Sequence, residues 1–149
     1  MVPEPVIKVV GAAIISGGNL LCAQRNKPAE LQGKWEFPGG KIEELETPEQ
    51  ALAREITEEL GCHIRVGDLL AKSQYNYESQ QVELAVYICE LVEGEPQPTE
   101  HKELRWQPIS ALKALDWAPA DREAVNILIA GFYPQYQSDQ EQEDAKSLV

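Results

Sequence analysis

The first quarter of the chain alternates between short apolar stretches and turn residues, a pattern that predicts antiparallel strands. Residues 6–16 are apolar and rich in β-branched side chains, and Ser16-Gly17-Gly18-Asn19 predicts a hairpin turn into a second strand at residues 20–25. A polar loop follows over residues 26–34, and an extended stretch over residues 35–40 leads out of it.

Residues 48–60 instead carry apolar side chains at helical spacing. Thr47 and Gln50 match a capping-box pair at the start of this segment, and Gly61 stands where a left-handed residue ends a helix. We therefore expect a helix with one buried face. The side chains on that face are Ala51, Leu52, Ile56 and Leu60.

The second half of the chain returns to the strand pattern. Residues 64–77 and 81–92 are predicted to pair, and in the second strand Val82, Leu84, Val86 and Ile88 alternate with less apolar residues, which predicts one better-buried face. A short strand at residues 104–106 and helices at residues 109–115 and 120–130 follow. The order of strands, one long helix, strands and closing helices predicts an α+β fold with α/β/α layers.

Length and composition favour one intracellular domain. The 149 residues suit a single core, which we place in residues 1–133, while the acidic residues 134–149 have little to bury and are expected to be disordered. A net charge of −12 argues against binding to nucleic acid polymers, and no apolar run is long enough for a membrane span. Three cysteines without metal-ligand spacing favour reduced thiols and a cytoplasmic protein. We expect a monomer or a homodimer.

Three carboxylates share one turn of the predicted helix and form a candidate metal site. Glu55 lies three residues before Glu58 and four before Glu59, and the latter two are adjacent. The three side chains therefore repel one another unless a cation or water screens them. Oxygen ligands of this charge suit Mg²⁺ or Mn²⁺ and argue against zinc. The alternative is a solvated acidic helix face. Arg54 lies beside the cluster, where we expect a salt bridge to hold the carboxylates in place.

The spacing around these carboxylates resembles the Nudix box. Gly40 is followed after five residues by Glu46 and after seven more by Arg54-Glu55-Ile56-Thr57-Glu58-Glu59-Leu60-Gly61. Cys62 departs from the family pattern, which has an aliphatic residue there, and a small apolar thiol can fill the same space. The resemblance implies the Nudix fold, an α/β/α sandwich with a mixed β-sheet and a loop-helix-loop around the box.

Further stretches are similar to the MutT-type branch of this family, namely residues 37–43, 46–51 and 93–96. The resemblance implies a Mg²⁺-dependent pyrophosphohydrolase acting on nucleotides such as 8-oxo-dGTP, with Mn²⁺ as a substitute. Its implied metal ligands are the Gly39 carbonyl, Glu55, Glu58, Glu59 and Glu100. Either Glu55 or Glu100 would be the general base, and the sequence leaves this choice open.

The resemblance also implies substrate contacts. Arg25, at the end of the second strand, would bind phosphate, and Phe37 would line the base pocket. The alternatives are a surface arginine at Arg25, a solvated loop carboxylate at Glu100 and a tight turn at Gly39 and Gly40.

Asp121 occupies the position where MutT-type enzymes carry an Asn that binds the base. An ionised Asp only accepts hydrogen bonds, which suits the exocyclic amine of cytosine or guanine better than guanine O6. The alternative is that Asp121 caps the last helix. Two other functions therefore remain open: hydrolysis of CTP or modified dCTP, and a Nudix-fold nucleotide-binding module without turnover.

Overall fold

The computed structural model describes residues 5–131, which form one mixed sheet between two helices. The strands are β1 (Val6–Ser16), β2 (Asn19–Gln24), β3 (Trp35–Glu36), β4 (Gly39–Lys41), β5 (His63–Asn76), β6 (Gln81–Glu93) and β7 (Glu103–Pro108). The α-helices are α1 (Pro48–Leu60) and α2 (Arg122–Ala130), and the short 3-10 helices are η1 (Ala29–Leu31), η2 (Ile109–Ala114) and η3 (Pro119–Asp121). Among these residues no helix is long and apolar enough to cross a membrane.

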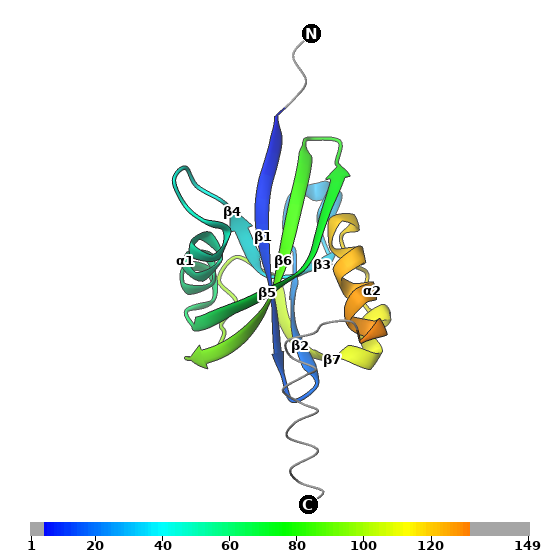
Figure 1. The fold of residues 1–149 in the computed structure, drawn as a ribbon. Coiled ribbons are helices and arrows are strands. Elements are labelled where there is room, and N and C mark those ends of the chain that lie inside the picture. The colour runs from blue at the N-terminus through cyan, green and yellow to red at the C-terminus, as the bar shows by residue number, and fades with distance from the viewer. Residues whose placement is uncertain (1–4, 132–149) are drawn as a thin grey trace, which may run out of the picture.

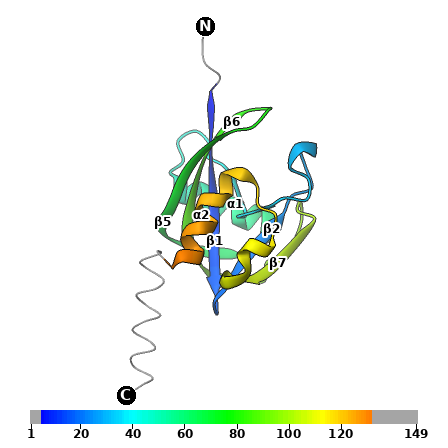
Figure 2. The ribbon, with the colours of Figure 1, turned by 90° about the vertical axis from the view of Figure 1, so that its right-hand side faces the viewer.

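The seven strands form a sheet with the order β3-β2-β1-β6-β5, while β4 pairs with β1 and β7 pairs with β2. The β1–β6 pair is parallel and the other pairs are antiparallel, so the sheet is mixed. Helix α1 covers one face of the sheet and α2 the other (Figure 1). In the view turned by 90°, α2 lies in front of the sheet (Figure 2). The predicted α/β/α layering is confirmed.

Local signals fixed the elements that the sequence predicted best. Gly17 and Gly18 both have positive φ, as a tight hairpin turn between β1 and β2 requires. Thr47 and Gln50 form the capping box of α1, and Gly61 ends the helix in the left-handed conformation. The predicted face of α1 is the buried one: Ala51, Leu52, Ile56 and Leu60 are all fully buried.

Apolar side chains from the two faces of the sheet form two clusters. One cluster joins the α1 face to alternate residues of β1, such as Val10, Ala12 and Ile14. The other joins α2 and η2 to the intervening residues, such as Ala13 and Ile15. Because β1 contributes to both clusters, it is the central strand of the sandwich. Cys22, Cys62 and Cys89 are buried and unpaired, as expected, and burial raises the pKa of Cys22 and of Cys89 to about 12.

The predicted elements agree with the structure except in three details. The better-buried face of β6 is confirmed, since Val82, Leu84, Val86 and Ile88 are all buried, and α1 also buries Ala85 and Cys89 on the other face. The last predicted helix is divided into η3 and α2, and the segment at residues 109–115 is a 3-10 helix that ends at Ala114. The loop over residues 26–34 contains η1. The predicted disorder of residues 134–149 lies outside the described residues.

Candidate active site

A pocket of about 270 Å³ lies where β1, the β5–β6 hairpin, η3 and the end of α1 come together. Most of the site residues expected from the sequence line it: Arg25, Phe37, Gly39, Glu59, Glu100 and Asp121. The pocket also contains Lys27, Lys41, Glu36, Tyr77 and His101, which were not among those candidates. Charged groups and apolar surface therefore share one cavity, as is typical of sites for small molecules.

The segment from Glu36 to Lys41 runs along this pocket and passes two glycines. Gly39 and Gly40 are part of β4, so the alternative of a tight turn was wrong. A side chain on Gly39 would collide with the Val10 carbonyl, and one on Gly40 would collide with the Glu55 carboxylate. Glycine is required at position 39 because the backbone of β1 approaches closely, whereas at position 40 the Glu55 side chain would have to move.

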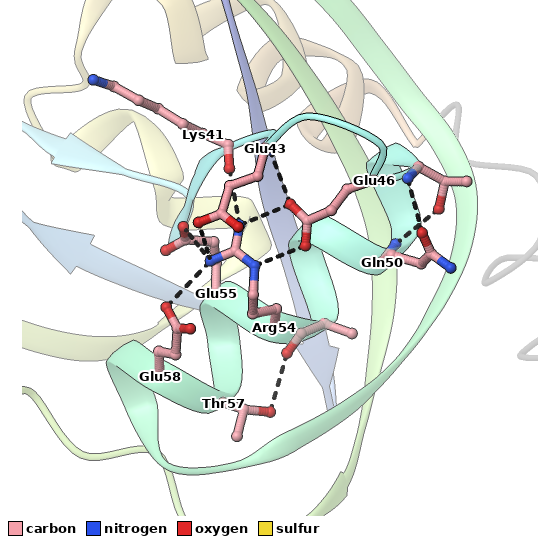
Figure 3. Close-up of polar contacts among 10 residues, drawn as sticks. Lys41, Glu43, Glu46, Gln50, Arg54, Glu55, Thr57 and Glu58 are labelled. Carbon is pink, nitrogen blue, oxygen red and sulfur yellow. Dashed lines mark hydrogen bonds and ion pairs between the residues drawn. The ribbon is translucent and has the colours of Figure 1, made fainter.

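Arg54 gathers four glutamates on one side of α1 (Figure 3). Its Nε and Nη2 donate to the two carboxylate oxygens of Glu46, at 2.8 and 2.9 Å. Its Nη1 donates to Glu55 Oε1 at 3.0 Å and to Glu58 Oε2 at 3.2 Å, and lies 3.7 Å from Glu43 Oε1. The predicted salt bridges are confirmed. Hydrogen bonds from Arg54 and from the Glu43 amide lower the pKa of Glu46. Glu46 thus orients Arg54, and Arg54 in turn bonds Glu55 and Glu58.

Glu59 lies on the pocket side of the same helix in a different environment. Its Oε2 is buried and has no hydrogen-bond partner among the described residues. Burial, followed by the negative charges of Glu55, Glu36 and Glu100, raises the pKa of Glu59 to about 8. Ionising a buried carboxylate beside three others is costly, which is why its pKa is raised.

These residues could hold a divalent cation. A cation beside Glu59 would give the buried Oε2 a partner and offset the negative charges that raise its pKa. In the described part of the chain, however, no three His, Cys, Asp or Glu side chains are already arranged around one point as a metal site. The side chain of Glu58 is 59% exposed and bonds Arg54, and Glu55 also bonds Arg54. Glu55 and Glu58 each bond Arg54 through one carboxylate oxygen, so the other oxygen of each would have to bind the ion.

Glu36 links two other groups of the pocket. Its Oε1 accepts from Arg25 Nη1 at 2.6 Å, and its Oε2 lies 2.9 Å from His101 Nε2. The side chain of Glu36 is 16% exposed and that of His101 is 8% exposed. Arg25 is thus a part-buried group held inside the pocket, and the alternative of an ordinary surface arginine was wrong. A charged residue between Trp35 and Phe37 in an apolar stretch was the sequence signal for Glu36.

Asp121 is buried at another part of the pocket. Its Oδ2 accepts from the Phe37 amide at 2.9 Å, and its side chain makes no capping bond to α2, so the helix-cap alternative was wrong. Burial, followed by the charge of Glu36, raises the pKa of Asp121 well above its usual value. Phe37 and Tyr77 lie nearby, and Tyr77 Oη accepts from the Ala120 amide at 2.9 Å. A polar group beside aromatic side chains can hydrogen-bond the edge of a planar ring while the ring packs against them.

Comparisons with known proteins identify the family. The NUDIX domain matches residues 6–126. The chain is 39% identical over 126 residues to the CTP pyrophosphohydrolase of Escherichia coli, covering 84% of this chain and 93% of that protein. It is 34% identical over 116 residues to the 8-oxo-dGTP diphosphatase of E. coli, covering 78% and 90%.

A solved structure gives the same result. The solution structure of the DNA mismatch repair protein MutT of methicillin-resistant Staphylococcus aureus 252 is 44% identical, covers 87% of this chain and 99% of that one, and superposes with a TM-score of 0.72. The fold, the carboxylates around α1 and these relatives all indicate the same family. The chain belongs to the Nudix hydrolase family, as a MutT-like member of it.

Proposed function

We propose that the protein is a Mg²⁺-dependent pyrophosphohydrolase that converts oxidised or non-canonical nucleoside triphosphates, such as 8-oxo-dGTP, to the monophosphate and pyrophosphate. The observation that carries this proposal is the environment of Glu59. Its buried Oε2 has no hydrogen-bond partner among the described residues, and the charges of Glu55, Glu36 and Glu100 raise its pKa. A non-catalytic binding module has no need for such an arrangement, because buried like charges oppose folding.

The proposed ligands of Mg²⁺, for which Mn²⁺ would substitute, are Glu55, Glu58, Glu59, Glu100 and the Gly39 carbonyl. The bound ion would neutralise phosphate charge and lower the pKa of a water that attacks phosphorus in line. Of the two candidates for the general base, Glu100 lines the pocket, whereas Glu55 is held by Arg54. We therefore assign the base to Glu100.

The remaining pocket residues would bind and orient the nucleotide. Arg25 is fixed by Glu36 at 2.6 Å and points a guanidinium into the same cavity as Glu59, so it would bind phosphate. Phe37 and Tyr77 would hold the base, and Asp121 would contact its polar edge. These residues place the reacting phosphate without taking part in bond formation.

A specific observation favours a second candidate substrate, CTP or modified dCTP. Asp121 uses Oδ2 to accept from the Phe37 amide, and when Asp121 is ionised its other oxygen offers the base only an acceptor. The N4 amine of cytosine is a suitable donor. The chain also resembles a protein named CTP pyrophosphohydrolase at 39% identity.

A panel of canonical and oxidised nucleotides with Mg²⁺, read by released pyrophosphate, tests this proposal. We expect 8-oxo-dGTP or a cytosine nucleotide to exceed the other canonical triphosphates in kcat/KM. Glu58→Gln should keep the fold and lower turnover by roughly two to four orders of magnitude, because it removes one ligand charge without changing volume. Equal rates for wild type and this variant at saturating Mg²⁺ would remove Glu58 from the site.

A further inference from the structure

The loop that carries Glu100 is tied to the end of helix α1. The last carbonyls of an α-helix have no partner within the helix. In α1 the Leu60 carbonyl accepts from the Gln97 amide at 2.9 Å, and the Glu59 carbonyl accepts from Thr99 Oγ1 at 2.6 Å. The residue before Glu100 is therefore hydrogen-bonded to the backbone of Glu59.

The other end of this loop is tied to the sheet. The Lys102 amide donates to the Gln24 carbonyl of β2 at 2.9 Å, next to Arg25. Glu100 thus lies in a short segment with one fixed point on the helix and one on the sheet. Of the helix-side contacts, the one made by Thr99 is formed by a side chain and can be removed by substitution.

We propose that Thr99 is a positioning residue that sets the place of the Glu100 carboxylate relative to Glu59. This inference rests on the proposed function, in which both carboxylates act in the pocket. Both line the cavity, and the charge of Glu100 is among those that raise the pKa of Glu59. A change in the backbone at Thr99 shifts Glu100 directly, and displacements of about 1 Å in a reacting group lower rates by large factors.

The side chain of Thr99 acts through its hydroxyl rather than through packing. Thr99 is exposed, so loss of its hydroxyl leaves the core unchanged, and the fold should tolerate Thr99→Val. Thr99→Ser keeps the hydroxyl and tests rescue. Thr57→Val is the matched control: Thr57 Oγ1 also bonds backbone carbonyls at α1, that of Ala53 at 3.0 Å and that of Cys62 at 3.4 Å, but does not line the pocket.

The experiment measures kcat, nucleotide KM and Mg²⁺ dependence for the full chain with Thr99→Val, Thr99→Ser, Thr57→Val, Glu100→Gln and the Thr99→Val/Glu100→Gln double variant. We expect Thr99→Val to lower kcat by about five- to twentyfold with KM changed by less than about twofold, because the substrate contacts remain. Thr99→Ser and Thr57→Val should stay within about twofold of wild type. In the Glu100→Gln background, Thr99→Val should have no further effect, because the group it positions is gone.

Two results would overturn the inference while leaving the proposed function intact: wild-type kcat in Thr99→Val, or an equal fall in kcat with and without Glu100. Wild-type turnover in Glu100→Gln would overturn it together with the role proposed for Glu100. The proposed function itself fails separately, through absence of pyrophosphate release from every nucleotide by the wild-type protein.

Discussion

Helix α1 separates two groups of carboxylates that have opposite electrostatic environments. The Arg54 group consists of Glu43, Glu46, Glu55 and Glu58 around one guanidinium (Figure 3). The pocket group consists of Glu36, Glu59, Glu100 and Asp121, which line the cavity. The two groups meet at the single helical turn that carries Glu55, Glu58 and Glu59.

The pKa of Glu46 in the first group and those of Glu59 and Asp121 in the second shift in opposite directions. In the first group, the hydrogen bond from Arg54 lowers the pKa of Glu46, and that bond raises the pKa of Arg54. In the second, burial and neighbouring negative charges raise the pKa of Glu59 to about 8 and also raise that of Asp121. The difference is that Arg54 compensates the first group, whereas in the pocket Arg25 pairs with Glu36 and the buried Oε2 of Glu59 has no partner among the described residues.

The largest expected effect comes from removing the charge of Glu59. Glu59→Gln should lower kcat by roughly two to four orders of magnitude, because the cation loses the carboxylate that most lacks a partner. Without metal, the melting temperature at neutral pH should stay equal or rise, since folding no longer has to protonate or bury this carboxylate. Thermal unfolding with and without Mg²⁺ and steady-state assays measure both effects.

Glu44→Gln is the matched control for this experiment, because Glu44 is an exposed glutamate in the loop before α1. It should keep wild-type turnover and the full increase in melting temperature on addition of Mg²⁺. A Glu59→Gln variant with the same Mg²⁺-dependent stabilisation as wild type would contradict the difference drawn between the two groups.

The next effect concerns substrate choice by the pocket group. Asp121→Asn should change the ratio of kcat/KM between cytosine and 8-oxoguanine triphosphates by about 1–3 kcal/mol, toward 8-oxo-dGTP. The amide oxygen can still accept from the Phe37 amide, and its nitrogen can donate to guanine O6. Assays of both substrates at one Mg²⁺ concentration measure the ratio. Asp116→Asn, an exposed aspartate paired with Lys34, is the control and should leave the ratio unchanged.

A smaller effect comes from removing the cation of the Arg54 group. Arg54→Gln leaves four carboxylates without their shared partner and should lower the melting temperature by about 5 °C at low salt, with a smaller decrease at high salt. It should also make stability more dependent on Mg²⁺, so that this group becomes similar to the pocket group. Arg65→Gln, which removes an exposed pair with Glu90, should change the melting temperature by less than about 1 °C. Similar decreases in the melting temperature of both variants would show that the Arg54 network stabilises the fold no more than an exposed ion pair does.

The smallest expected effect concerns Leu45, in the loop beside the Arg54 group, and depends on backbone conformation rather than on charge. Leu45 has a φ of 69° and a side chain that is 99% exposed. Leu45→Gly should raise the free energy of unfolding by about 0.5 kcal/mol, since the left-handed penalty of a leucine exceeds the entropy lost with glycine. Leu45→Ala removes the side chain but keeps the penalty, so urea denaturation should show little gain. Equal stabilisation by both would assign the effect to the exposed side chain.

Sequence reasoning predicted most of the fold because its signals lie within a few residues of one another. The hairpin glycines, the capping box at Thr47 and the apolar face of α1 each depend on contacts within one or two turns. The strand pattern did not show where a second layer would pack. Ala85 and Cys89 on the other face of β6 are buried because α1 packs on them, and a strand pattern alone does not show what covers each face.

The sequence by itself determined the family, the helix with its glutamates and the residue types suited to a hard cation. Only the tertiary structure decided how those charges are compensated. The contacts that do so span long separations: Glu36 meets His101 across 65 residues, and Phe37 meets Asp121 across 84. The physical reason is that a carboxylate's pKa depends on its burial and on the charges within a few ångströms, and the packing of distant segments sets both.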